Sequence, residues 1–227
     1  MDVNLLVQTV AIYALPVLFA ITLHEAAHGY VARYFGDMTA HAQGRISLNP
    51  IRHIDPVGTI AVPALILIAS SLAGTHGFLF GWAKPVPVNY SALRKPRQHM
   101  ALVAAAGPGA NLGMALGWVA LLKLSLLMPE NTFSAAMEAM SQAGIMVNLI
   151  FMFLNLLPIL PLDGGRIALS LLPRSLAIPY SNTERFGFIL VIVLLVTGAL
   201  GVVLGPLFRI ALAAIGAVTG VDMRSGL

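Results

Sequence analysis

The sequence predicts an all-α polytopic membrane protein, a helical bundle of about five to six membrane segments with a small membrane-associated β-hairpin region. Three observations support this fold class. Hydrophobic residues make up 58% of the 227 residues and charged residues only 10%, whereas about one quarter of a soluble domain is charged. Apolar runs long enough to cross a bilayer recur along the chain, and a Gly- and Pro-rich stretch between two of them alternates like a strand.

The first predicted element is one retained helix from about residue 4 to residue 34. Its end is indicated by Phe35-Gly36-Asp37, and its last third carries His24, Glu25 and His28. The two histidines share a helix face, so one metal ion can bind between them, and Glu25 can reach a water molecule there. This pattern indicates hydrolytic zinc chemistry. The alternative is that the three side chains only stabilise a helical bundle.

Four further apolar segments are predicted to form membrane helices. They span about residues 57–80, 100–128, 142–160 and 186–219. The last segment is long enough for two short spans, and Gly201, Gly205 and Pro206 indicate a break between them.

The polar stretches before and after the segment 57–80 are rich in Gly, Pro, Asn and Arg. Residues Trp82 to Asn89 alternate like a strand but contain two prolines, which favours an edge strand or hairpin over a helix. Residues Gly44 to Leu48 are a second candidate edge. A hydrogen-bonding edge at either place would hold an extended substrate, and ordinary interfacial loop is the alternative for both.

Residues 155–166 interrupt a hydrophobic segment with two prolines and two glycines. Broken helix at membrane depth is tolerated only where its backbone is buried in protein or lines a polar cavity. Asp163 is the only acidic residue between Glu138 and Glu184, and the chain has no cysteine, so a metal must be held by His and carboxylate. Catalytic zinc normally takes three protein ligands, which makes Asp163 the predicted third one. A turn or cap at the membrane surface is the alternative.

Three motifs therefore follow one another on three apolar segments. They are His24-Glu25-x-x-His28, Gly107-Pro108-x-x-Asn111 and Asn155-x-x-Pro158-x-x-Pro161-Leu162-Asp163-Gly164-Gly165-Arg166. Together they resemble the site-2 protease family of intramembrane zinc metalloproteases. The resemblance implies that His24, His28 and Asp163 bind zinc and that Glu25 is the general base. It also implies that Asn111 and Asn155 help to hold the substrate strand or the oxyanion, and that strand-like segments receive the substrate as an added strand.

Three other polar residues are weaker candidates for the site. His53 and Asp55 are candidates for lining the cavity or surrounding the metal ligands, although a polar turn before the next helix explains them as well. Asn148 lies on a face similar to that of Asn155 and is a candidate for the wall of the active site. A hydrogen bond within the bundle is the alternative for Asn148.

The predicted function is that of a zinc metalloendopeptidase that cleaves membrane-spanning segments of substrate proteins, with one Zn²⁺ per chain and the lipid bilayer as its surroundings. The alternative is a non-proteolytic zinc-binding membrane protein or metal carrier, since transporters also place His and Asp near the bilayer midplane. A carrier has no need of a base beside the first histidine, so Glu25 discriminates between the two. We expect a single membrane-embedded metalloprotease domain over residues 1–227, with its motifs within 20–170 and no soluble regulatory domain.

The charge pattern predicts topology and not nucleic-acid binding. The net charge is +4, but the basic residues are scattered through the loops between apolar segments. These loops are predicted to be cytoplasmic, and the loop around Asn131, which has no basic residue, is predicted to lie outside a plasma membrane of bacterial type. The active-site cavity is then expected to open to the cytoplasm, and residues 57–80 to return to the side they left. The sequence predicts no oligomeric state.

Overall fold

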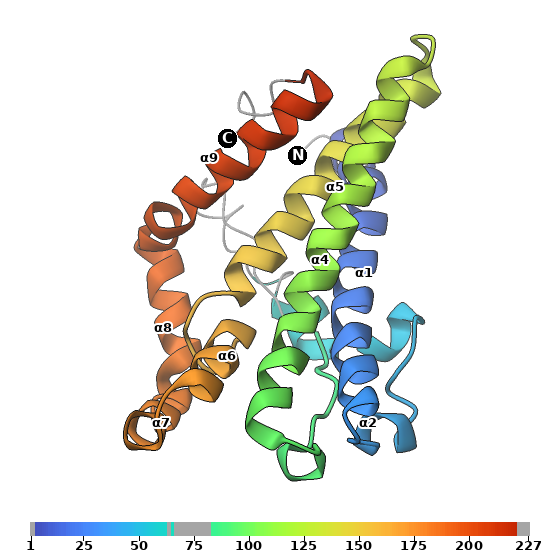
Figure 1. Ribbon diagram of the computed structural model, residues 1–227. Coiled ribbons are helices and arrows are strands. Elements are labelled where there is room, and N and C mark those ends of the chain that lie inside the picture. Colours follow the sequence, from blue (N-terminus) through green and yellow to red (C-terminus); the bar gives the residue numbers. More distant parts are fainter. Residues whose placement is uncertain (1–2, 63–64, 66–82, 222–227) are drawn as a thin grey trace.

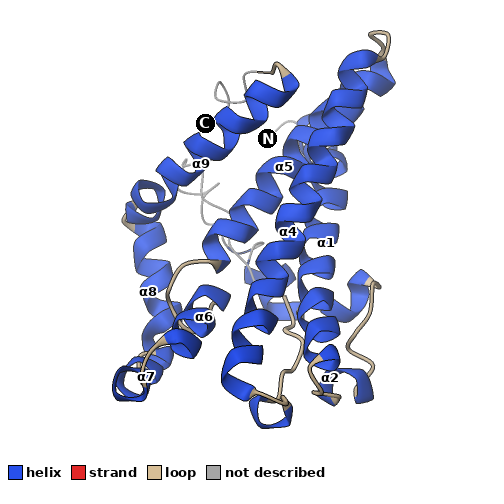
Figure 2. Cartoon of the chain, viewed as in Figure 1, coloured by secondary structure: helices blue, strands red, loops and turns tan. Residues whose placement is uncertain are grey.

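Helices α1 (Val3–Tyr34), α4 (Pro96–Leu127) and α5 (Thr132–Asn155) pack side by side along most of their length (Figure 1). The structure is a computed structural model that describes residues 3–62, 65 and 83–221. Within these residues every regular element is a helix, and no strand is present (Figure 2). The all-α prediction is therefore confirmed for the described part of the chain.

The C-terminal part of the chain forms a second group of helices beside this bundle (Figure 1). In chain order it contains α6 (Asp163–Leu171), α7 (Arg174–Ser181), α8 (Glu184–Val196) and α9 (Ala199–Thr219). Among the residues that the structure describes, four short helices lie between α1 and α4, namely α2 (Thr39–Ala42), η1 (Pro50–His53), η2 (Pro56–Ala61) and η3 (Tyr90–Ala92).

Several of these helices are suited to a bilayer. Among the described residues, Val7–Tyr34 of α1 together with α4, α5 and α9 makes four helices that are long and apolar enough to span it. Helices α7 and α8 pass the same test as a pair, bent by 66° at their junction. Four or five candidate spans compare with the predicted five to six, and most of the predicted segment 57–80 lies outside the described residues.

Helices α4 and α5 pack through one close contact and one apolar cluster. Asn131 begins α5 with a capping box, because its side chain accepts the Ser134 N–H while Ser134 Oγ bonds back to the Asn131 backbone. Gly144 lies against the Trp118 ring, and a Cβ atom at position 144 would overlap it. The buried cluster continues through Leu122 and Ile145. This packing sets the rotation of α4 and α5, and hence which polar residues face α1.

The end of α1 is tied to the beginning of α4. Gly36 adopts a φ of 106°, a conformation that glycine tolerates best, and the helix ends at Tyr34 as the sequence predicts. The Phe35 and His99 rings stack with centroids 4.0 Å apart, and the Arg94 N–H donates to the Phe35 carbonyl at 3.0 Å. Helix α1 therefore ends where α4 starts, and the two run antiparallel.

The interruption predicted at residues 155–166 is present. Helix α5 ends at Asn155, a loop follows, and α6 begins at Asp163. A Cβ atom at Gly164 would overlap the Leu156 backbone, and one at Gly165 would come within 2.5 Å of the Ile159 carbonyl carbon. The two glycines therefore let α6 turn back directly onto the loop, which brings Asp163 toward the bundle.

The predicted break within residues 186–219 lies at a different position. Gly198, with a φ of 74°, separates α8 from α9, whereas Gly201, Gly205 and Pro206 all lie inside α9. The Gly198 N–H closes the last turn of α8 on the Leu195 carbonyl, so the left-handed glycine ends that helix. The prediction of a break near residues 201–206 is wrong because a Pro within an apolar helix removes only one backbone hydrogen bond.

The predicted β-hairpin region also needs correction. Residues 83–89, called the strap below, form an irregular loop, and residues Gly44 to Leu48 are not a strand either. The hairpin prediction is therefore wrong for the described residues, while Trp82 lies outside them. Pro85 and Pro87 lack an N–H group and cannot donate to a β-ladder.

The strap instead bonds to side chains of neighbouring elements. The Val86 N–H donates to Glu25 Oε2 at 2.7 Å, and the Asn89 N–H donates to Asp37 Oδ2 at 2.6 Å. Arg45 Nη2 donates to the carbonyls of two further strap residues at 2.9 and 3.2 Å. The strap N–H groups thus bond to the carboxylates of Glu25 and Asp37, and not to the backbone of a neighbouring strand as the alternating sequence suggested.

Candidate metal centre

His24 and His28 are both buried and lie one turn apart on α1. His28 Nδ1 donates to the Val103 carbonyl at 2.7 Å, and His24 Nδ1 lies 2.6 Å from Asn111 Oδ1. A carbonyl oxygen can only accept, so each ring carries a proton on Nδ1, and in the neutral imidazole the Nε2 lone pair is then free to bind a metal ion. Both acceptors belong to α4, which therefore orients both rings.

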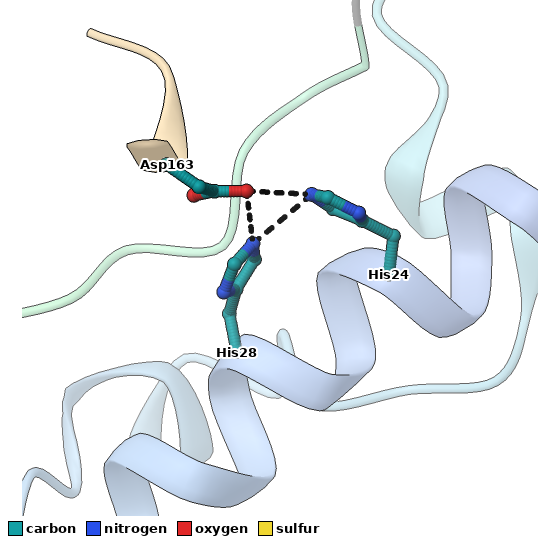
Figure 3. Close-up of side chains that lie close together, drawn as sticks. All are labelled: His24, His28 and Asp163. Carbon is teal, nitrogen blue, oxygen red and sulfur yellow. Dashed lines mark hydrogen bonds and ion pairs between the residues drawn. The ribbon is translucent and has the colours of Figure 1, made fainter. Parts of the chain in front are cut away.

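Asp163 brings a carboxylate to the same place from α6. Its Oδ2 lies 3.2 Å from His24 Nε2 and 3.4 Å from His28 Nε2, and the two Nε2 atoms are 3.1 Å apart. Figure 3 shows the three side chains converging on a common point from α1 and α6. The structure thus brings together all three residues predicted as metal ligands, and they form the group of described residues suited to a metal ion.

The chemistry of these three atoms fits a cation. Two Nε2 lone pairs and a carboxylate oxygen face one another, and Asp163 Oδ2 is buried without a hydrogen-bond partner among the described residues. Such a cluster of electron-pair donors is repulsive unless a proton or a metal cation lies between them. Tetrahedral zinc with bonds of about 2.0–2.2 Å needs ligand atoms about 3.3–3.5 Å apart, close to the separations observed here.

Gly107 on α4 makes room for the two histidine rings. A Cβ atom at this position would lie 2.5 Å from His28 Nε2 and 2.6 Å from His24 Nε2. Val103, Gly107 and Asn111 are spaced four apart and so share one face of α4. On this face the Val103 carbonyl and the Asn111 side chain accept hydrogen bonds from the two histidines, and Gly107 leaves space for their rings.

A cavity of about 600 Å³ opens in front of the three atoms. Its polar lining includes Glu25, Asn155 and Arg166 beside the metal-ligand candidates, and the rest is largely apolar. The apolar lining comes from Ile21, Met100, Val103, Ala104, Phe151, Leu154, Leu162, Phe188, Val191 and strap residues. Glu25 is half-buried, and its carboxylate faces the cavity while holding the strap through Val86.

The three asparagines differ in their positions. Asn155 lines the cavity and donates through Nδ2 to the Phe151 carbonyl at 2.9 Å. Asn111 is completely buried behind His24, and Asn148 is completely buried behind Asn111, to which it is bonded at 3.0 Å. Of the three, Asn155 therefore lines the cavity, and Asn148 makes the hydrogen bonds within the bundle that were its alternative interpretation.

His53 and Asp55 belong to the turns before the segment 57–80. His53 is buried, with Nε2 2.7 Å from the Ser47 carbonyl, and Asp55 accepts the N–H groups of Val57 and Gly58 at the start of η2. Neither is in the His24, His28 and Asp163 group. Their contacts correspond to the polar turn that was the alternative interpretation.

Four features of the site were not predicted from the sequence. The Val103 carbonyl and the Val86 N–H are backbone groups, which carry no residue-type signal. Arg166 was noted only as part of a motif, yet it lines the cavity. Gly107 was likewise noted only within its motif, and its position four residues before Asn111 is the signal that could have indicated a notch against the histidines.

Comparisons with known proteins agree with this geometry. Residues 117–198 match the sequence profile of Peptidase family M50. The chain is 41% identical over 195 residues to a protein of Bacillus subtilis named "Putative zinc metalloprotease YwhC", covering 85% of this chain and 83% of that protein. It is 30% identical over 187 residues to a protein of Mycolicibacterium smegmatis named "Putative zinc metalloprotease Rip2", covering 81% of this chain and 66% of that protein. No solved structure gives a significant match.

The family profile and the alignment with YwhC cover different parts of the site. The family profile covers Asp163 and Asn155 but begins after the two histidines, whereas the alignment with YwhC covers most of both chains. Family membership implies zinc as the cofactor, and the buried His, His and Asp group provides a donor set for it. The chain belongs to peptidase family M50, the site-2 protease family of membrane-embedded zinc metalloproteases.

Proposed function

We propose that this protein hydrolyses peptide bonds within membrane-spanning segments of substrate proteins, with His24, His28 and Asp163 as zinc ligands and Glu25 as general base. The observation that carries the proposal is the convergence of two Nε2 atoms and one carboxylate oxygen, 3.1 to 3.4 Å apart, at the wall of a cavity that Glu25 also lines. Zinc bound there supplies Lewis-acid activation of water and of the scissile carbonyl.

Glu25 is suited to proton transfer by its place on α1. It follows His24 directly, so its carboxylate projects beside the ligand face and into the same cavity. Oε2 accepts the Val86 N–H, which fixes the carboxylate and leaves Oε1 to take the proton of the attacking water. The same group then passes the proton to the leaving amine, so that one residue acts as base and afterwards as acid.

The cavity is suited to an apolar and locally unwound substrate. Its lining is mostly aliphatic and aromatic, which matches the side chains of a membrane-spanning segment. A helical substrate has its carbonyls shielded in intrahelical hydrogen bonds, so the cleaved region must become extended. Asn155 is the amide that lines the cavity, and we assign it the role of holding the substrate backbone or the developing oxyanion.

The cavity is proposed to open to the cytoplasm of a bacterial-type cell. His24 precedes the end of α1 at Tyr34 by ten residues, which is about 15 Å at 1.5 Å per residue. That end of the bundle carries basic residues, including Arg33 in the last turn of α1 and Arg94, whose N–H donates to the Phe35 carbonyl. Water therefore has a short route to Glu25 from the basic side, where positive charge favours the cytoplasm.

The test is zinc content and cleavage measured on the same purified protein in detergent, with a single-span peptide as substrate. His24→Ala and Asp163→Ala each remove a ligand and are expected to lose both zinc and activity. Glu25→Gln keeps the shape of the side chain but not its basicity, so it is expected to retain about one zinc per chain and lose about 10²–10⁴-fold in rate. His41→Ala, at an exposed histidine on α2, is the matched control and is expected to retain both.

Two results would contradict the proposal. If Asp163→Ala kept full zinc and near-normal cleavage, Asp163 would not be the third ligand. If wild-type protein bound zinc but cleaved no spanning peptide, and Glu25→Gln left its zinc binding unchanged, a non-proteolytic zinc-binding protein would be the better description.

A further inference from the structure

We propose that Asn111 and Asn148 are positioning residues that fix the tautomer and ring orientation of His24, and thereby set the zinc affinity of the centre. This role differs from the substrate or oxyanion role that the sequence motif implied for Asn111. The proposal rests on the proposed function, because it takes His24 as a zinc ligand.

The hydrogen bonds of this pair have only one consistent direction. The Gly144 carbonyl can only accept, so the Asn148 atom 2.8 Å from it is Nδ2, and Asn148 Oδ1 must face Asn111. Asn111 Nδ2 donates to that oxygen at 3.0 Å and also points to the Ala20 carbonyl at 3.4 Å. Asn111 Oδ1 is therefore the atom that faces His24 Nδ1 at 2.6 Å.

This direction determines which nitrogen of His24 is free. With an amide oxygen against Nδ1, the ring proton stays on Nδ1 and the Nε2 lone pair points toward Asp163. If the Asn111 amide were reversed, its NH₂ group would face Nδ1 and the proton would move to Nε2. That tautomer would have an N–H where the metal ligand is needed.

Burial separates this role from substrate binding. Asn111 and Asn148 are both completely buried, and neither lines the cavity in front of the metal centre. The Asn111 amide forms its hydrogen bonds with His24, Ala20 and Asn148, all of which belong to the bundle. A substrate would have to displace His24 to reach Asn111, whereas Asn155 is open to the cavity.

His28 provides an internal reference. Its Nδ1 donates to the backbone carbonyl of Val103, which no side-chain substitution removes. The two ligands are thus oriented by the same face of α4 through different means, a backbone acceptor for His28 and a side-chain relay for His24. Substitutions in the relay are expected to affect one histidine and not the other.

The test is zinc affinity, measured by competition with a chelator on full-length protein in detergent. Asn111→Leu keeps the approximate volume but removes the acceptor, and is expected to weaken zinc binding by about 10–100-fold. Asn148→Leu leaves Asn111 free to reverse, and is expected to weaken binding by about 10-fold. The double variant is expected to be no weaker than Asn111→Leu alone, because Asn148 acts through Asn111.

A second measurement reads the tautomer directly and does not depend on activity. In zinc-free protein labelled with ¹⁵N-histidine, His24 and His28 are both expected to carry the proton on Nδ1. Asn111→Leu is expected to shift His24 toward the Nε2–H form and leave His28 unchanged. Ser141→Ala is the control, because this buried hydroxyl of α5 has no hydrogen-bond partner among the described residues and is expected to alter neither affinity nor tautomer.

The outcomes distinguish this proposal from the proposed function. Wild-type zinc affinity and an unchanged His24 tautomer in Asn111→Leu would overturn the positioning role, and cleavage lost in that variant would then assign Asn111 to the substrate. Additive losses in the double variant would show two independent structural effects and would also overturn it. If wild-type protein bound no zinc, or if His24→Ala bound as much zinc as the wild type, the proposed function itself would fail.

Discussion

A single hydrogen atom on Gly107 stands where any other residue would place a carbon between the two histidine rings. Gly107→Ala puts a Cβ atom 2.5 Å from His28 Nε2 and 2.6 Å from His24 Nε2, so at least one ring must move. We expect this variant to retain well under one zinc per chain and to lose most of its cleavage. Zinc per protein by elemental analysis, beside peptide cleavage, is the measurement.

The same helix supplies a matched control for this substitution. A Cβ atom at Gly109 or Gly113 meets no neighbouring atom within 4 Å, so Ala there is expected to keep zinc and activity. Ala also has a higher helix propensity than Gly, by about 0.5–1 kcal/mol. Full zinc binding in Gly107→Ala would mean that the rings are not held against α4.

Asn155 offers the opposite test at the residue scale. It lines the cavity but is outside the group of three ligand candidates, so Asn155→Ala is expected to keep zinc and slow cleavage by about 10²–10³-fold. The reason is that one donor or acceptor for the substrate is lost while the metal ligands are untouched. Steady-state cleavage and zinc content on one preparation measure this, and zinc loss would instead make Asn155 structural.

At the scale of elements, the strap is held at one end by Asp37. This buried carboxylate accepts the Asn89 N–H at 2.6 Å and the Thr39 N–H at 2.9 Å. In Asp37→Asn the amide NH₂ must face one of these donors, which leaves a buried N–H unsatisfied at a cost of about 1–3 kcal/mol. Hydrogen exchange of the strap is therefore expected to be about 10-fold faster. Asp55→Asn, which keeps a good cap for η2, is the control.

The pH dependence of this contact follows from the Asp37 pKa. Burial by itself raises the pKa of Asp37, but the hydrogen bonds from Thr39 and Asn89 outweigh burial and hold it below the ordinary value of 3.8. A lowered folded-state pKa contributes stability that is complete above pH 3.8 and is lost as the pH falls through the folded-state pKa. Strap protection, corrected for intrinsic exchange, is thus expected to stay constant from pH 7 to about pH 5. A loss of protection in that range would assign the contact to another group.

Helix α8 contacts the loop that leads to Asp163 through Gly187. A Cβ atom at this position would overlap the Leu160 carbonyl oxygen, a backbone atom with little freedom to move. Gly187→Ala is expected to cost about 1–3 kcal/mol and lower the midpoint of thermal unfolding by about 2–10 °C. The displaced loop is also expected to weaken zinc binding. In Gly201→Ala, where no atom lies within 4 Å, neither change is expected, and equal stability of the two variants would contradict the contact.

At the scale of the whole molecule, the helix directions make a topological prediction. The turn between α4 and α5 lies at the opposite end of the bundle from α2 and α7 (Figure 1). The chain has no cysteine, so single cysteines at Asn89 and Ser181 are expected to label only from the cytoplasmic side, and one at Asn131 only from outside. Labelling with a membrane-impermeant maleimide, before and after permeabilisation, is the measurement. Opposite accessibility of Asn89 and Ser181 would contradict the assignment of both α4 and α5 as membrane spans, because these two helices are the candidate spans between the labelled positions.

The antiparallel course of α1 and α4 agrees with the expectation that the intervening chain returns to the side it left. Helix α1 ends beside the start of α4, where Phe35 stacks on His99. Helix α5 then runs back to the same end, so Asp163 follows it onto the histidine side. The order of helices therefore brings the third ligand candidate to the same end of the bundle as the histidines.

The features that could be predicted from the sequence are those that depend on local spacing and composition. The apolar runs specified membrane helices, two histidines four apart specified one helix face, and the prolines and glycines around Asp163 specified a broken segment. Each of these follows from the geometry of a few neighbouring residues. For that reason the three ligand candidates and the all-α class were predictable without coordinates.

The groups that face the histidines are distant in the sequence, and they are known only from the folded arrangement of the helices. Asn111 and Val103 are 87 and 75 residues from their histidine partners, and their contacts depend on how α4 is rotated against α1. The strap looked like a strand, but its backbone bonds to the Glu25 and Asp37 carboxylates instead. Helix rotation is set by close packing contacts such as that of Gly144 with the Trp118 ring. Many weak contacts of this kind between residues distant in the sequence add up, and a local sequence pattern does not contain them.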